Sequence, residues 1–163
     1  MKKTLILLSF ILLSATSFAQ QKFNTEALDY KMELLNGKNQ TFKKVLQKYK
    51  GKNVLIDVWA SWCPDCIKGL PKVKELQQQF PEVVFLFIDM DKTTDKWKAA
   101  IDKYDLKGEH IYAEGGMKSE FGKAITLDWI PRYMLVNKKG EILVFKAITA
   151  DDANLITTLN TLK

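Results

Sequence analysis

The stretch that decides the fold runs from Val54 to Cys66 and reads Val-Leu-Ile-Asp-Val-Trp-Ala-Ser-Trp-Cys-Pro-Asp-Cys. Residues 54–59 are apolar except for Asp57, which is typical of a strand covered on both faces of a sheet. From Cys63 onward apolar residues recur every three or four positions, which predicts a helix that begins at the motif. A buried strand that leads directly into a helix indicates an α/β protein.

The rest of the chain continues this alternation of strands and helices. Pro71 should kink the helix after the motif, Thr149 or Asp151 should cap the last helix, and Gly140 should close a hairpin turn. The pattern predicts one three-layer α/β domain, with a central mixed, mostly parallel sheet, a C-terminal β-hairpin and helices on both faces. Strands are predicted at 30–34, 54–59, 83–88, around 111, 133–136 and 142–145, and helices at 42–49, 63–80, 97–104, 119–125 and 155–162.

The N-terminus has the three parts of a secretory signal peptide. Lys2 and Lys3 precede an apolar run that ends in small residues, and we expect cleavage after Ala19 and export to the periplasm. Because residues 4–21 carry no charge, an uncleaved anchor that holds the domain on the periplasmic side is the alternative, although the apolar run is short for a membrane span. The predicted organisation is a signal peptide at 1–19, an extended lead-in at 20–29 and a domain at 30–163.

The charge of the chain is mild and dispersed. The formal net charge of +6 falls to +4 when Lys2 and Lys3 are removed (6 − 2 = 4). Arg132 is the only arginine, whereas nucleic-acid recognition uses clustered basic residues with aromatic platforms, so no nucleic-acid partner is expected. A hydrophobic fraction of 47% indicates a packed core instead of disorder.

Cys63 and Cys66 are the only cysteines. Two cysteines exclude a disulfide-rich scaffold and a four-cysteine zinc site, and His110, the only histidine, adds too few ligands for another metal site. A purely structural disulfide across so short a loop would constrain the unfolded chain little. In an exported protein, the pair therefore predicts redox chemistry on other molecules.

The place of each cysteine on the predicted helix suggests its role. The N–H groups and the dipole at a helix N-terminus stabilise an anion, so the thiolate of Cys63, at an exposed cap position, is favoured. Pro64 suits the first helical position, where its missing N–H costs nothing. Cys66 shares a helix face with the apolar Leu70 and should be buried. These positions predict that Cys63 attacks a disulfide and that Cys66 resolves the mixed disulfide.

Three features occur in an order that resembles the thioredoxin fold, and specifically the exported TlpA/ResA-like thiol-disulfide oxidoreductases. They are WASWCPDC after the strand VLIDV, the Ile-Pro-Arg segment at 130–132, and the hairpin around Gly140. The resemblance spans roughly residues 30 to 162. It implies that Pro131 is cis and faces the cysteine pair, and that the backbone of Ile130 pairs with an extended client segment.

Asp57 interrupts the buried strand. Desolvation there should raise the pKa of its carboxyl, which suits it to accept or return the proton of Cys66. By the same resemblance, it matches the buried acid of thioredoxins. The alternative is a structural Asp57 that reaches solvent or a backbone partner at the strand end.

Two residues near the pair depart from the family pattern. Asp65 stands where thioredoxins have proline and strongly oxidising members have histidine. A carboxylate there opposes the stabilisation of the Cys63 thiolate, which favours the disulfide and therefore a reducing couple; it is also a good residue for a first helical turn. Arg132 stands where many relatives have threonine, which leaves the substrate preference open. The predicted client-binding residues are Trp62, Pro64, Asp65, Ile130 and Arg132.

Taken together, these features predict a periplasmic thiol-disulfide oxidoreductase that reduces protein disulfides through a mixed-disulfide intermediate, with no cofactor. The implied partners are disulfide-containing client proteins and a membrane-bound electron donor, as for relatives that act in cytochrome c maturation or cell redox homeostasis. A monomer is expected. The alternatives are a disulfide oxidase or isomerase, and a thioredoxin-fold binding module without net turnover, which commonly loses one cysteine.

Overall fold

The computed structural model describes residues 22–163. The predicted signal peptide at 1–19 and the cut after Ala19 lie outside the described residues. Within the described part, no helix is both long enough and apolar enough to cross a membrane.

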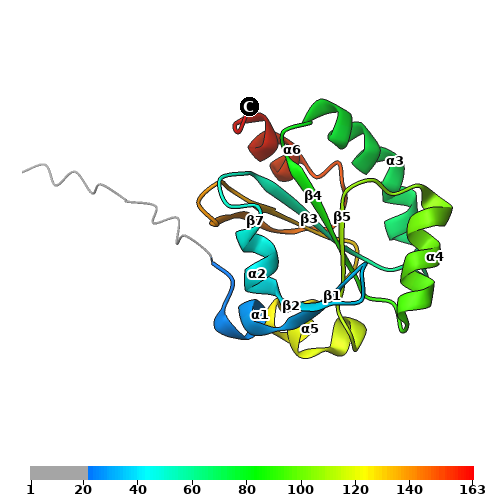
Figure 1. Cartoon of the computed structure of the whole chain (residues 1–163). Helices are drawn as coiled ribbons and strands as arrows, with labels where there is room; N and C mark the ends of the chain where they lie inside the picture. Colours follow the sequence, from blue (N-terminus) through cyan, green and yellow to red (C-terminus); the bar gives the residue numbers. More distant parts are fainter. Residues whose placement is uncertain (1–21) are drawn as a thin grey trace, which may run out of the picture.

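Within residues 22–163, seven strands form one sheet in the order β2-β1-β5-β4-β3-β6-β7 (Figure 1). Residues 54–66 form the central strand β3 and the start of helix α3, which places the cysteine motif at the C-terminal end of β3. The strands are β1 (Lys31–Leu34), β2 (Asn39–Thr41), β3 (Val54–Trp59), β4 (Val84–Asp89), β5 (Glu109–Tyr112), β6 (Arg132–Val136) and β7 (Ile142–Ala147).

The sheet is mixed, as predicted, but the expectation that it is mostly parallel is wrong. Only the β3–β4 and β4–β5 pairs are parallel, because α3 and α4 carry the chain back across the sheet between these strands. The other four pairs are antiparallel. They include the predicted C-terminal hairpin of β6 and β7, where Gly140 has the left-handed φ of 79° that the turn requires.

Helices cover both faces of the sheet. Side chains of directly paired residues point to the same face, so the stack of Trp97 on Tyr112 places α4 on the same face as Asp89, the partner of Tyr112. Figure 1 shows α3, α4 and α6 gathered on that side, and α1, α2 and α5 on the other. The helices are α1 (Thr25–Asp29), α2 (Phe42–Gln47), α3 (Pro64–Gln79), α4 (Thr94–Tyr104), α5 (Glu120–Ala124) and α6 (Ala153–Asn160).

Three local expectations differ from the structure. Part of the predicted extended lead-in forms helix α1, because Asn24 caps it and the fully buried Ala27 joins the core. The short edge strand β2 carries no apolar alternation and was not predicted. Helix α6 is capped by Asp152, whose side chain accepts a hydrogen bond from Leu155 N, and not by Thr149 or Asp151. Pro71, the residue expected to kink this helix, lies inside α3, which continues past it as one helix to Gln79.

Candidate active site

The two cysteines lie at the N-terminus of α3 and form a disulfide. Cys63 is the N-cap residue and Pro64 the first residue of the helix, as their order in the sequence predicts. The Cys66 backbone N–H donates to Cys63 Sγ over 3.1 Å. A sulfur in this position receives the orphan N–H of the first turn, which is the arrangement that stabilises a thiolate when the disulfide opens.

A loop before β6 faces the disulfide. Its Ile130–Pro131 peptide bond is cis, as the family resemblance implied. Cys63 Sγ lies 3.6 Å from the carbonyl oxygen of Ile130. The segment expected to pair with a client therefore lies directly beside the sulfur expected to attack it.

Both cysteines are covered in the disulfide form. Cys63 is 4% exposed and Cys66 is 1% exposed, so the expectation of an exposed Cys63 is wrong for this state, because the Ile130–Pro131 loop packs against its sulfur. The surface around them is nevertheless apolar and open. Trp62 and Trp129 are 53% and 55% exposed, and they border a cavity of about 360 Å³ that is also lined by Cys63, Pro64, Asp65, Met117, Asp128 and Ile130.

Asp57 is 3% exposed on β3, and its Oδ1 has no hydrogen-bond partner among the described residues. Desolvation by burial raises the pKa of its carboxyl to about 8. The alternative in which Asp57 reaches solvent or a backbone partner does not fit this environment. A carboxyl that titrates in this range can exchange a proton with a thiol near neutral pH.

Two further buried acids, Asp89 at the end of β4 and Asp91 just after it, lie near the motif and were not predicted. Asp91 accepts hydrogen bonds from Ser61 N (2.9 Å) and Ser61 Oγ (2.8 Å), so it fixes the loop that leads to Cys63. Asp89 is fully buried, and desolvation raises the pKa of its carboxyl to about 8. The available signal was the Ile-Asp-Met-Asp sequence at 88–91, where acids end an apolar strand.

Arg132 differs from its expected role. Its side chain is 0% exposed and its guanidinium donates to Asp128, which also accepts from Lys146. Burial lowers the pKa of Arg132. Because the side chain is enclosed, it does not form the client-binding surface that the sequence predicted; it holds Asp128, next to the exposed Trp129, in place.

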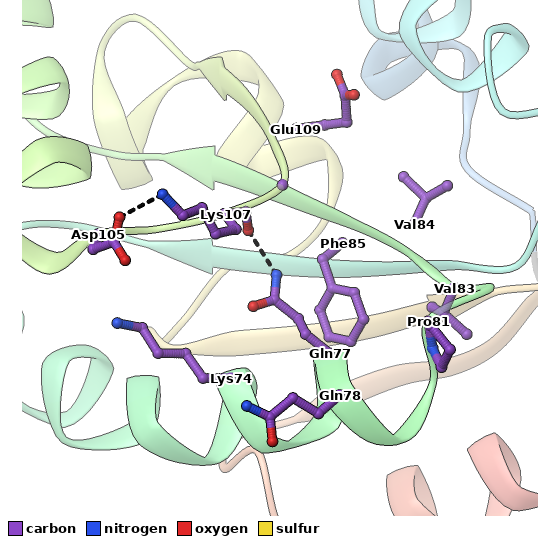
Figure 2. A pocket seen from close by; sticks show the side chains of 11 residues that line it. Lys74, Gln77, Gln78, Pro81, Val83, Val84, Phe85, Asp105, Lys107 and Glu109 are labelled. Atoms are coloured by element: carbon purple, nitrogen blue, oxygen red, sulfur yellow. Dashed lines mark hydrogen bonds and ion pairs between the residues drawn. The ribbon is translucent and has the colours of Figure 1, made fainter.

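A further cavity, of about 530 Å³, lies at the opposite end of the sheet (Figure 2). It is bordered by the C-terminal half of α3, with Lys74 and Gln77, and by Lys107 of the segment before β5. Gln77 donates to the Lys107 carbonyl and Lys107 to Asp105. His110 is buried near the middle of the sheet, where it stacks on Phe87. The described residues contain no group of three or more acidic, histidine or cysteine side chains that could hold a metal ion.

Comparisons with known proteins agree with this geometry. A thioredoxin-like family model matches residues 51–142 of the 163, more than half of the chain. The thiol-disulfide oxidoreductase ResA of Bacillus thuringiensis subsp. konkukian is 29% identical over 130 residues, which cover 78% of this chain and 71% of that protein. The thioredoxin-like protein YneN of Bacillus subtilis is 29% identical over 121 residues, 72% of this chain and 66% of that protein.

A solved structure is similar as well. The solution structure of a Bacteroides vulgatus protein described as a thiol-disulfide oxidoreductase superposes with a TM-score of 0.70 at 29% identity, and the match covers 88% of this chain and 92% of that one. The chain belongs to the thioredoxin-like family. With its Cys63–Cys66 disulfide at the start of α3, it is a thiol-disulfide oxidoreductase of that family.

Proposed function

We propose that the protein is an exported reductase of protein disulfides. The observation that carries this proposal is the Cys63–Cys66 disulfide at the N-terminus of α3, which faces the backbone of Ile130 and Pro131 beside an apolar surface. An extended client can add to that backbone as a strand does, with an apolar side chain held between Trp62 and Trp129.

In the proposed reaction the reduced enzyme supplies two electrons. The Cys63 thiolate attacks a client disulfide, which forms a mixed disulfide and releases one client thiolate. Asp57 accepts the proton of Cys66, and the Cys66 thiolate then attacks Cys63 Sγ. The Cys63–Cys66 disulfide forms and the second client thiolate leaves, so that the client gains two electrons and two protons overall.

Asp65 supports the reductive direction. It lies in the first turn of α3, immediately after Pro64, and it is exposed. Its negative charge competes with the Cys63 thiolate for the positive end of the helix dipole. A less stabilised thiolate makes the disulfide harder to reduce, and a couple of that kind donates electrons to clients.

Export and the electron donor belong to the same proposal. The charged, apolar and small-residue parts of the first 19 residues support secretion. A periplasmic reductase must be re-reduced, and we propose that a membrane-bound thiol donor transfers two electrons to the Cys63–Cys66 disulfide. The similarity to the thiol-disulfide oxidoreductase ResA supports this proposal.

The proposal is tested by insulin reduction with dithiothreitol as the electron source. The wild type should accelerate precipitation of the insulin B chain, and Cys63→Ser should lower the rate to the uncatalysed background. Equal rates for both proteins would contradict an enzyme and favour a binding module.

The direction of transfer is tested by the reduction potential of the pair, measured by equilibration with glutathione. We expect a value below about −200 mV, whereas a value near −120 mV, as in DsbA, would indicate an oxidase. Asp65→His should raise the potential, and Glu75→His, on the same helix beyond the first turn, is the control that should leave it unchanged.

A further inference from the structure

A cavity of about 410 Å³ lies on the α3 side of the sheet, next to the active site. It opens between α3 and the segment that precedes α6, and Tyr133 of β6 is one of its walls. Its lining includes Asp65, Lys68, Gly69, Pro131, Tyr133 and Asp151. This cavity is separate from the apolar one beside Trp62, although Asp65 and Trp129 border both.

The hydroxyl of Tyr133 is buried without a partner. The residue is 0% exposed, and its hydroxyl has no hydrogen-bond partner among residues 22–163. A side chain at Gly69 would start 3.0 Å from that oxygen, so the absence of a side chain there leaves the room that the hydroxyl uses. Since a buried hydroxyl without a partner is costly, its retention calls for an explanation.

Tyr133 is also the direct cross-strand partner of Asp57. Side chains of such a pair lie on the same face, with their Cβ atoms about 4.5–5.5 Å apart. Cys66 lies one helical turn before Gly69 and is buried on the face of α3 that covers the sheet. The phenol therefore lies beside Asp57 on the face of the sheet that α3 covers, and it borders the cavity.

The electrostatics of Tyr133 fit this position. Burial, followed by the charges of Asp57 and Asp151, raises the pKa of the phenol. The hydroxyl therefore keeps its proton throughout the range in which Asp57 titrates. It can pass a proton along a hydrogen-bonded chain without becoming a stable anion.

We infer that Tyr133 is a positioning residue that connects Asp57, through water in the cavity, to the solvent. The inference rests on the proposed role of Asp57. When Asp57 has taken the proton of Cys66, that proton passes to a water hydrogen-bonded to the phenol oxygen. The phenol releases its own proton to water on the solvent side of the cavity and takes up the proton from the first water. One proton therefore leaves the site, and Tyr133 is unchanged.

Several charged groups surround this route, and its pH dependence includes their influence. Desolvation also raises the pKa of Asp89, which lies on the neighbouring strand β4 on the same face of the sheet. The titratable or charged groups that face the route are Asp57 of β3, Asp89 of β4, Cys66, Asp65, Lys68 and Lys72 of α3, and Asp151 before α6.

The test separates the two thiol steps with the aromatic disulfide DTNB. Attack by Cys63 of the reduced protein releases one thionitrobenzoate, and attack by Cys66 on the mixed disulfide releases the second. The rate of each release is measured between about pH 5 and about pH 9. Tyr133→Phe removes only the hydroxyl, and Tyr112→Phe is the matched control, because Tyr112 is also buried on the same face of the sheet.

We expect Tyr133→Phe to slow the second release about fivefold, the effect of one neutral hydrogen bond, and to leave the first unchanged. The midpoint of its pH profile should rise, because the charged form of Asp57 loses the water that the phenol holds beside it. Gly69→Ala should act in the same direction by displacing the hydroxyl, and it keeps the test valid if Tyr133→Phe folds poorly. Tyr112→Phe should match the wild type.

Asp57→Asn distinguishes failure of the inference from failure of the proposed mechanism. If Asp57→Asn removes the pH midpoint while Tyr133→Phe and Gly69→Ala both retain the wild-type profile, Tyr133 has no such role and Asp57 keeps its own. If Asp57→Asn itself retains the wild-type profile, the proposed role of Asp57 is wrong and the connection through Tyr133 is wrong with it.

Discussion

The polar groups at the two ends of the sheet differ in burial and in hydrogen bonding. At the end that carries the disulfide, Asp57 Oδ1, Asp89 Oδ2 and the Tyr133 hydroxyl lie buried without hydrogen-bond partners among the described residues. At the other end, around the larger cavity of Figure 2, Lys74 donates to the carbonyl of Tyr104 and Gln77 to that of Lys107. The difference indicates that the buried, unsatisfied carboxyls and phenol near the disulfide, and not cavity volume, mark the chemical site.

The buried carboxyls near the disulfide lower the stability of the folded protein, whereas the half-buried and exposed groups of the far end have no such cost. A carboxyl with a raised pKa destabilises the folded protein wherever the unfolded chain would ionise. Such a cost is retained where the group has a function, which for Asp57 is the proposed proton exchange with Cys66. Four predictions, from the largest effect to the smallest, test this contrast between the disulfide end and the far end.

The largest effect should come from Cys66→Ser. Without the resolving thiol, Cys63 should remain joined to the client, so turnover should stop after one attack. Mass spectrometry of the protein incubated with an oxidised client should detect the mixed disulfide as a stable adduct. The double variant Cys63→Ser, Cys66→Ser has no thiol left and is the control that should form no adduct. Absence of an adduct on Cys66→Ser would contradict attack by Cys63.

The second prediction concerns stability against pH. Asp57 and Asp89 have folded-state pKa values raised from 3.8 to about 8, so between these values the unfolded state binds fewer protons than the folded state. The free energy of unfolding should therefore fall as pH rises through this window, by up to about 1.4 kcal/mol per pH unit for each carboxyl, and should level off above it.

Asp57→Asn and Asp89→Asn should each reduce that slope, and the double variant should remove most of it. Urea denaturation of the oxidised proteins at several pH values measures the slope directly. Asp105→Asn, an exposed acid at the far end, is the control that should keep the slope of the wild type. A wild type with pH-independent stability across this window would contradict the buried, neutral state of both carboxyls.

The third prediction concerns the anchor of the motif loop. Asp91→Ala removes the acceptor of two hydrogen bonds from Ser61 and should destabilise the protein by about 2–3 kcal/mol. Ser61→Ala removes only the hydroxyl bond and should cost about 1 kcal/mol. Chemical denaturation of the two variants gives both values, and equal costs would mean that the backbone N–H bond contributes nothing.

The smallest effect should come from the far end. Gln77→Ala and Lys107→Ala alter exposed or half-buried groups around the cavity of Figure 2. Each should change the free energy of unfolding by less than about 0.5 kcal/mol and leave insulin reduction at the wild-type rate. A large loss of activity in either variant would show that the two ends of the sheet are coupled.

The parts of the fold that were predictable are those with strong local patterns. The apolar run 54–59 and the helical spacing after Cys63 gave β3 and the start of α3 within one residue of their observed bounds. Helix α1 and strand β2 were missed because they are short and polar, and their stability comes from contacts such as that of the buried Ala27 with the core.

Within the site, the sequence by itself determined the chemistry of the pair. Two cysteines three residues apart at a helix N-terminus, and an acid within an apolar strand, require only local spacing to be recognised. Which side chains of different strands lie next to one another could be known only from the tertiary structure. The antiparallel pairing of β3 with β6 brings Tyr133 beside Asp57 and encloses Arg132, because register between strands distant in sequence decides which side chains share a face.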